Sequence, residues 1–184
     1  MKKQNIINLL IESFDDNKSV NFVVKQDKNR IKRLRTLMEY SYFVANSFGE
    51  IYISEDQLAC ALLIDPSKKK TTLKSIFWDL KLLFKCIGIF NIGKVLKREK
   101  SIKQYHPNED FIHLWYIGVK KSEQGKGRGT QLMHQIINDY SLKNKPIYLE
   151  TSMEKNFPFY EKLGFKMITE MDTVGYPLRM YFKK

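Results

Sequence analysis

Cysteine is scarce in this sequence, because Cys60 and Cys86 are the only two among 184 residues. So few cysteines exclude a disulfide framework and a cysteine-based zinc site. His106, His113 and His134 have scattered spacing, so we expect no histidine metal site either. No apolar run reaches the ~18 residues of a membrane-spanning helix, and the first residues lack the apolar run of a signal peptide. We therefore expect a soluble, cytoplasmic protein with reduced thiols.

Apolar and aromatic residues, in contrast, are plentiful. Apolar residues make up 43% of the chain and charged residues 28%, a balance typical of globular proteins. The 12 Phe, 10 Tyr and 2 Trp supply enough bulk for a sizeable core, which argues against a disordered or fibrous chain. A length of 184 residues suits one domain, so we expect a single domain over residues 1–184.

Positive charge is concentrated in one part of the chain. Of the formal net charge of +12, +9 falls between Pro66 and Gln104, where eleven Lys and Arg residues accompany only two acids, Asp79 and Glu99. One interpretation is a lysine-rich composition combined with a solvated helical face. The other is a surface for an acidic partner, such as nucleotide phosphates, anionic lipid or nucleic acid.

Apolar periodicity predicts an alternation of helices and strands. The expected helices cover residues 6–14, 28–47, 128–140 and 154–163, and the expected strands cover residues 50–54, 57–64, 109–119, 146–151, 164–172 and 178–182. Residues 20–24 fit either a strand or a turn of helix. This mixed order predicts an α/β fold with a mixed, mostly antiparallel sheet flanked by helices.

Residues 68–104 separate the predicted hairpin from the longest predicted strand. A plain loop of this length is uncommon in a compact domain, so the segment should have structure of its own. Its apolar residues keep helical spacing and predict two helices, with a kink near Gly88 and Gly93. We call this segment the helical excursion.

A glycine-rich turn is the part of the sequence most suggestive of a ligand site. It reads Gln124-Gly125-Lys126-Gly127-Arg128-Gly129-Thr130, between a predicted strand and a predicted helix. Glycines let the backbone approach a ligand closely, and a helix N-terminus attracts anions, so the turn predicts a pyrophosphate cradle. The spacing fits neither a P-loop nor a Rossmann fingerprint. Gln124, Gly127 and Gly129 instead fit the pattern Gln/Arg-x-x-Gly-x-Gly/Ala, which binds the pyrophosphate of coenzyme A.

A second motif lies downstream of the turn. Leu149-Glu150-Thr151-Ser152 is followed by Asn156-Phe157-Pro158-Phe159-Tyr160-Glu161-Lys162-Leu163-Gly164-Phe165. Together the two motifs resemble the GCN5-related N-acetyltransferases (the GNAT superfamily), and within it the branch containing puromycin N-acetyltransferase. The close resemblance covers residues 111–165. Two departures are a Lys120-Lys121 pair where an acidic residue and proline are common, and an opening strand that is missing or reduced to residues 20–24.

The resemblance implies how a coenzyme would be held. In the family, the strand that ends at Val119 splays from the strand at 146–151. The pantetheine arm of acetyl-CoA lies in that gap, against main-chain groups of Ile117, Gly118 and Val119. The pyrophosphate is held by the main-chain amides of all seven residues of the turn, Gln124 to Thr130.

The resemblance also implies two side-chain contacts with the coenzyme. Asn156 helps to hold the pantetheine arm, although it could simply begin or cap its helix. Tyr160 points at the sulfur, and a phenol there can give a proton to the leaving thiolate. A strand N–H near Val119 would stabilise the developing oxyanion.

Three residues are candidates for the chemistry, and each has a structural alternative. Tyr160 is the expected acid, or an aromatic residue packed on the sheet. Glu150 is a candidate base, acting directly or through water, or a charge that orients the substrate, or an edge-exposed carboxylate. His113 is a candidate proton relay or pocket residue, or a satisfied core histidine. We expect His106 and His134 to be structural or exposed.

The predicted function is transfer of an acetyl group from acetyl-CoA to a primary amine of a small molecule, by direct attack on the thioester. The alternative is a non-catalytic acyl-CoA-binding or sensor module, against which the presence of Tyr160 and Glu150 argues. Nucleic-acid binding has little support, because clustered lysines come without a recognised binding motif. A homodimer is left open.

The helical excursion should wall or cover the acceptor end of the cleft. Its candidate lining residues are Phe77, Trp78, Phe84 and Phe90. A competing interpretation is that its exposed apolar face binds a membrane surface or a second subunit.

Overall fold

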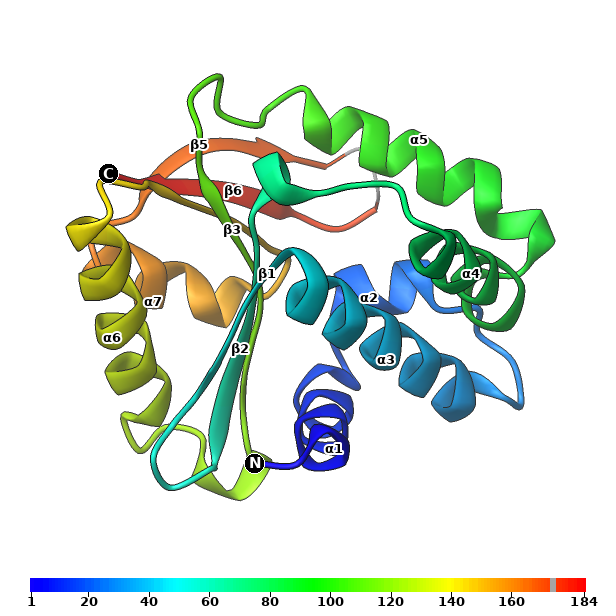
Figure 1. The fold of residues 1–184 in the computed structure, drawn as a ribbon, viewed down its shortest axis with the longest axis horizontal. Coiled ribbons are helices and arrows are strands. Elements are labelled where there is room, and N and C mark those ends of the chain that lie inside the picture. Colours follow the sequence, from blue (N-terminus) through cyan, green and yellow to red (C-terminus); the bar gives the residue numbers. More distant parts are fainter. Residues whose placement is uncertain (173–174) are drawn as a thin grey trace.

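A six-stranded sheet runs through the centre of the structure in the order β1-β2-β3-β4-β6-β5 (Figure 1). The computed structural model describes residues 1–172 and 175–184. The strands are β1 (Gly49–Ile53), β2 (Ala59–Ile64), β3 (Ile112–Val119), β4 (Ile147–Thr151), β5 (Lys166–Met171) and β6 (Leu178–Lys183). Neighbouring strands pair antiparallel except β3 and β4, which are parallel. The predicted α/β class and the mixed, mostly antiparallel sheet are confirmed.

Helices cover both faces of this sheet. They are α1 (Lys3–Phe14), α2 (Lys18–Val23), α3 (Arg30–Phe48), α4 (Leu73–Leu82), α5 (Ile92–Lys103), α6 (Arg128–Leu142) and α7 (Phe157–Lys162). Figure 1 shows α6 and α7 on one side of the strands and α1 and α3 on the other. Residues 20–24, which fitted two structures, lie mostly in α2. Asn17 begins this helix, because its side chain accepts a hydrogen bond from the N–H of Val20 at 3.0 Å.

The central strand β2 shows how the two faces acquire separate cores. Side chains alternate along a strand, so odd-numbered and even-numbered residues face opposite ways. Ala59, Ala61 and Leu63 belong to the core under α6 and α7, whereas Cys60 and Leu62 belong to the core under α1 and α3. All six residues of β2 are buried.

A bulge in β3 changes the face that its side chains occupy. Leu114 pairs with Leu63 and Tyr116 pairs with Leu62, so Trp115 is an extra residue on β3. Leu114 packs in the core under α6, and Tyr116 packs in the opposite core under α1. The pairing of β3 with β4 covers only residues 112–114. Beyond Leu114, β3 pairs only with β2, so the predicted splay between β3 and β4 is present.

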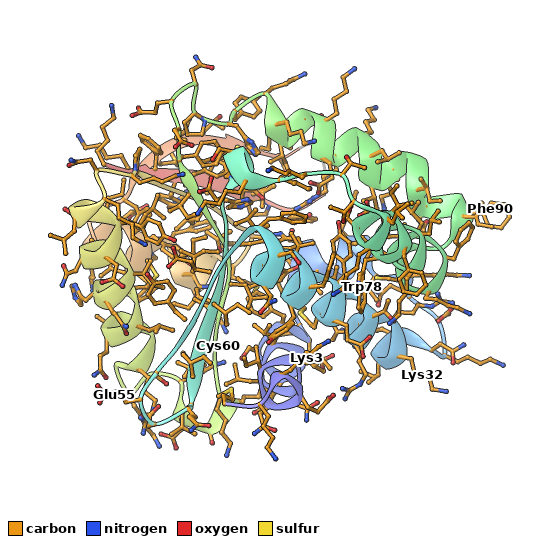
Figure 2. The ribbon with its side chains drawn as sticks, in the orientation of Figure 1. Lys3, Lys32, Glu55, Cys60, Trp78 and Phe90 are labelled. Carbon is orange, nitrogen blue, oxygen red and sulfur yellow. The ribbon has the colours of Figure 1, made fainter. Side chains whose placement is uncertain are left out.

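The helical excursion contains the two predicted helices. α4 continues into a π-helical turn, Leu83–Ile87, and a 3-10 turn, Ile89–Asn91, leads into α5. Gly88 separates the two turns with φ of 78°, a left-handed conformation that favours glycine. The result is a sharp break at Gly88 rather than a kink. Figure 2 shows Phe90 projecting from the outer corner where the two halves meet.

Candidate active site

The glycine-rich turn, the end of β3 and the start of α7 converge beside the splay. A Cβ atom built on Gly129 would lie 3.5 Å from Val119 Cγ2 and 3.9 Å from Phe159 Cζ. These are ordinary contact distances, so the first turn of α6 lies directly against both neighbours. Two motifs that are far apart in sequence therefore border one gap in the sheet.

The main-chain amides of the turn form an anion cradle. Gly125 and Gly127 have φ of 78° and 80°, and Gly127 begins α6 without a side-chain cap. Among the described residues, the N–H groups of residues 125–130 donate no well-formed hydrogen bond, whereas the next N–H, that of Gln131, donates to the Gly127 carbonyl at 3.0 Å. Consecutive free amides at a helix N-terminus attract anions, because the helix dipole adds to their partial positive charge. The turn therefore offers free amides to an anion, and binding of a pyrophosphate there stays a prediction.

Carboxylates already hold the cationic side chains of the turn. Glu123 pairs with Lys126 at 3.1 Å and with Arg128 at 2.9 Å. Arg128 also forms an ion pair with Asp56 in the β1–β2 hairpin. These contacts offset the side-chain charge, so the main chain supplies most of the attraction for an anion. No pattern in the sequence marked Glu123 or Asp56 as neighbours of the turn.

Two predicted coenzyme residues also have clear roles within the protein. The Val119 carbonyl accepts hydrogen bonds from Ser13 Oγ at 2.9 Å and from Gln124 Nε2 at 3.2 Å. The Gln124 side chain thus ties the turn to the end of β3. A Cβ atom on Gly118 would lie 3.0 Å from Leu9 Cδ2, so a glycine there lets α1 pack against β3. A coenzyme contact by Gln124, Ile117, Gly118 or Val119 stays a prediction.

Tyr160 and Asn156 lie on and beside α7. Tyr160 is buried, with ring centroids of Phe165 and Tyr181 at 5.8 and 6.0 Å. Burial raises the pKa of its phenol, which keeps the proton in place. Asn156 begins α7, but its side chain makes no capping hydrogen bond. The side-chain amide of Asn156 is therefore not used to cap α7.

A second group of polar side chains lies on the opposite face of β4. Leu149 packs in the core with Tyr160, so the alternating side chain of Glu150 points to the other face. Glu150 Oε1 lies 3.7 Å from His113 Nε2 and 3.8 Å from His106 Nε2. The structure brings Glu150 and His113 close together, at a separation longer than a hydrogen bond, and their role in proton transfer stays a prediction. We call Glu150, His113 and His106 the carboxylate–histidine cluster.

Burial and charge act in opposite directions on this cluster. Burial alone would raise the pKa of Glu150, but the protonated forms of His113 and His106, together with Arg98, outweigh it and the pKa is lowered. Burial lowers the pKa of His113 more than the Glu150 charge raises it. His113 is therefore neutral and Glu150 ionised near neutral pH.

Three members of this region were missed by the sequence analysis. His106 was expected to be structural or exposed, yet its side chain is only 26% exposed and contacts Glu150. Tyr148 packs against both histidines and has a buried hydroxyl without a hydrogen-bond partner among the described residues. Arg98 of α5 is buried and donates to the Tyr176 hydroxyl at 3.0 Å. No local sequence signal marks these contacts. His134 is exposed on α6, as expected.

A cavity of about 330 Å³ lies between α3, α4 and the end of α5, and no member of the carboxylate–histidine cluster lines it. Lys103 lines the cavity, and its carbonyl accepts a hydrogen bond from the N–H of His106 at 3.3 Å. Tyr40, another lining residue, packs edge-on against Trp115 of β3 with centroids 6.3 Å apart. The remaining lining residues come from the end of α3, the segment before α4 and α4 itself: Phe43, Val44, Phe48, Lys69, Lys70, Thr71, Ser75 and Asp79.

The excursion contributes to this cavity with residues other than the four expected. Phe77, Phe84 and Phe90 are exposed and absent from the cavity wall. Only Trp78 is turned inward, where it stacks on Phe43 with centroids 5.4 Å apart. The expectation was wrong for these three phenylalanines: α4 docks on α3 through the face opposite Phe77 and Phe84, and Phe90 projects into solvent from the corner after them.

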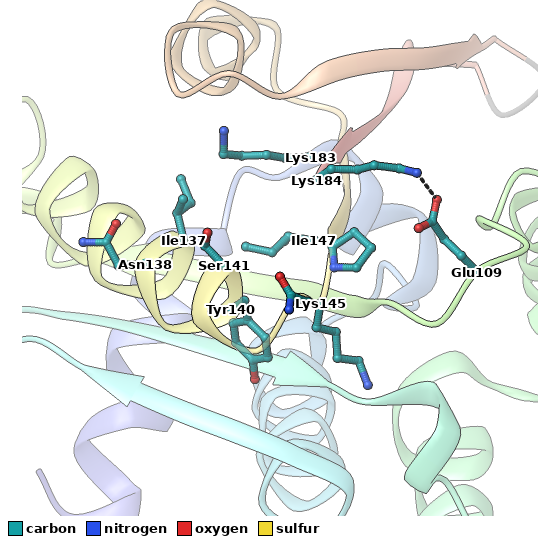
Figure 3. A pocket seen from close by; sticks show the side chains of 11 residues that line it. Glu109, Ile137, Asn138, Tyr140, Ser141, Lys145, Ile147, Lys183 and Lys184 are labelled. Carbon is teal, nitrogen blue, oxygen red and sulfur yellow. Dashed lines mark ion pairs between the residues drawn. The ribbon is translucent and has the colours of Figure 1, made fainter.

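Another cavity, of about 320 Å³, lies at the far end of α6 (Figure 3). It is lined by residues including Tyr140, Pro146 and Lys183, and Lys184 pairs with Glu109 at its edge at 2.9 Å. The 15 residues of α6 separate it from the turn, a helix length of about 22 Å. This cavity is therefore distinct from the candidate site.

Neither a metal centre nor a membrane-spanning helix is found in the described ranges. Within residues 1–172 and 175–184, no three His, Cys, Asp or Glu side chains are grouped to hold a metal ion. No helix in those ranges is long and apolar enough to cross a bilayer.

Comparison with known proteins connects this geometry to a family. Residues 88–167 match the family model of the acetyltransferase (GNAT) domain. An uncharacterized N-acetyltransferase of Schizosaccharomyces pombe is 30% identical over 161 residues, covering 83% of this chain. The chain spans 65% of the length of that relative.

Solved structures share the fold. A histone acetyltransferase HPA2 and related acetyltransferase from Corynebacterium glutamicum gives a TM-score of 0.69 at 18% identity, covering 98% of this chain and 90% of that chain. Arylalkylamine N-acetyltransferase 2 from Aedes aegypti gives a TM-score of 0.62 at 14% identity. The match covers 98% of this chain and 93% of that chain. At such identities the likeness shows the fold, which is that of GNAT acetyltransferases.

Proposed function

We propose, from the GNAT acetyltransferase domain matched in residues 88–167, that this protein transfers an acetyl group from acetyl-CoA to a primary amine. The observation that carries the proposal is the row of unpaired amides at residues 125–130 beside the splayed strands. A pyrophosphate fits that cradle, and the splay leaves the far side of β3 without a partner strand beyond Leu114.

The coenzyme would be held mainly by main-chain groups. The amides of the turn would bind its pyrophosphate, and the open edge of β3 from Ile117 to Val119 would pair with its pantetheine arm. The free amide of Asn156 would hold the same arm. Acetyl-CoA, when bound, supplies an activated thioester carbonyl.

Proton transfer would involve groups on both faces of the sheet. The Glu150–His113 pair would take a proton from the incoming ammonium group, because only the free amine is a nucleophile. Tyr160, whose phenol keeps its proton, would give a proton to the leaving thiolate. An N–H near Val119 would stabilise the oxyanion.

We further propose that the acceptor is a small amine that carries an acidic group. Lys69, Lys70 and Lys103 line the cavity between α3, α4 and the end of α5 and form no ion pair among the described residues. A carboxylate or phosphate on the acceptor would offset their charge, while Tyr40 and Phe43 offer aromatic walls.

Location and branch are also proposals. The two cysteines are buried and unpaired, which suits a reducing cytoplasm. The likeness to puromycin N-acetyltransferase rests on the sequence motifs alone.

A thiol-release assay tests the proposal. Acetyl-CoA is offered with neutral amines and with amines that bear a carboxylate or phosphate, and free thiol is measured. We expect turnover with amines, fastest with the acidic ones, and loss of that preference in Lys70→Gln. Coenzyme binding by calorimetry without turnover on any amine would instead support the non-catalytic module.

A further inference from the structure

A stripe of large apolar side chains on α4 faces water. It consists of Leu73, Ile76, Phe77, Leu80 and Phe84, which recur at intervals of three and four residues and therefore share one helical face. Leu73 is 88% exposed and Phe77 is 63% exposed. No residue of α4 is buried. We call these five residues the apolar stripe.

The exposed surface continues at the corner after α4. Ile89 is 65% exposed and Phe90 is 99% exposed, and Figure 2 shows Phe90 extending beyond the rest of the molecule. Monomeric proteins rarely expose contiguous apolar patches unless something covers them. The apolar stripe and this corner therefore indicate a docking surface.

The stripe is not the result of a detached helix. The opposite face of α4 is fixed to α3 by the Tyr40 hydroxyl, which donates to Asp79 at 2.8 Å, and by an ion pair between Lys81 and Glu39 at 2.9 Å. Trp78 stacks on Phe43. Since these contacts orient α4, its apolar face is held toward solvent.

Lysines of the excursion precede and follow the stripe in the sequence. Eight lysines of the excursion form no ion pair among the described residues: Lys69, Lys70, Lys74, Lys85, Lys94, Lys97, Lys100 and Lys103. Both acids are engaged, because Asp79 accepts from Tyr40 and Glu99 pairs with Arg98 at 2.5 Å. Lys97 and Lys100 share the outward face of α5 with the exposed Leu96.

We propose that the apolar stripe and the Phe90 corner dock on an anionic lipid bilayer. Helices that lie on membranes combine a face of Phe and Leu with flanking lysines, which meet the headgroups. Charge argues against a second copy of this chain, since a two-fold interface would bring two segments of net charge +9 together. An acidic surface offsets that charge instead.

Vesicle sedimentation tests the docking surface independently of acetyl transfer. The full chain is mixed with vesicles of phosphatidylcholine alone or with one third phosphatidylglycerol. We expect binding to the anionic vesicles, weakened at least tenfold by Phe77→Asp with Phe90→Asp and weakened by raised salt. Leu142→Asp is the matched control, because Leu142 is 86% exposed on α6, away from the excursion.

Charge reversal separates local from overall charge. Lys97→Glu with Lys100→Glu should weaken binding, whereas the same change at the exposed Lys162 and Lys166 should have little effect. Equal loss with both pairs, or equal binding to neutral vesicles, would overturn the proposal. So would a dimer in light scattering that Phe77→Asp converts to a monomer without any vesicle binding.

Discussion

Replacing Glu150 by Gln removes one charge from the carboxylate–histidine cluster and keeps the shape of the side chain. When His113 takes up a proton, its imidazolium and the Glu150 carboxylate 3.7 Å away attract by about 4 kcal/mol at an effective dielectric of about 20. Positioned general bases contribute roughly 10²-fold to 10⁴-fold to rate, which is about 3–5 kcal/mol of barrier. The two magnitudes agree, so we expect Glu150→Gln to lower kcat/KM by roughly 10²-fold or more.

The pH dependence gives the sharper test. In the wild type, kcat/KM should fall at low pH as the Glu150–His113 pair takes up a proton, with an apparent pKa that belongs to the pair. Without the Glu150 charge, only burial and nearby positive charges act on His113, so its pKa falls further. The His113 imidazole should then titrate at lower pH in NMR spectra of Glu150→Gln than in the wild type.

A surface carboxylate provides the control for this experiment. Glu154 has a side chain 62% exposed and pairs with Lys18, so Glu154→Gln should leave both readouts unchanged. If Glu150→Gln kept wild-type kcat/KM and an unchanged His113 titration, the reasoning about the cluster would be refuted.

Other changes test the remaining parts of the site. Tyr160→Phe should lower kcat by roughly 10-fold to 10³-fold with nearly unchanged coenzyme affinity; wild-type kcat would make Tyr160 a packing residue. Gly127→Val should weaken calorimetric acetyl-CoA binding at least tenfold, because it disturbs the cradle, whereas Gly175→Val, at a similar φ of 78°, should not. Gly118→Val should destabilise the protein by about 1–3 kcal/mol in urea unfolding, since α1 packs against that glycine; an unchanged midpoint would contradict this. The pKa of His113 is lower folded than unfolded, so the free energy of unfolding should decrease as pH falls below about 6.5, and His113→Gln should reduce that decrease.

The conformation of the glycine-rich turn was predictable because it is local. Its glycines, its helix start and its free amides all come from consecutive residues, so spacing alone indicated a pyrophosphate cradle. The order of helices and strands was predictable for a similar reason, since apolar periodicity reports local structure. Whether residues 20–24 form a strand or a helix could not be read from their own apolar pattern. The helix there begins with the side-chain cap at Asn17, which lies outside that segment.

The sequence by itself therefore determined the succession of elements, the cradle and the motif around Tyr160. Only the tertiary structure decided that His106 meets Glu150, because that contact depends on how β4 lies against the segment after α5. It also decided that the apolar stripe of α4 faces water. Periodicity defines an apolar face, but which way that face points depends on the contacts of Trp78 and Asp79 with α3. Contacts between distant residues follow from strand register and helix docking, which no local pattern records.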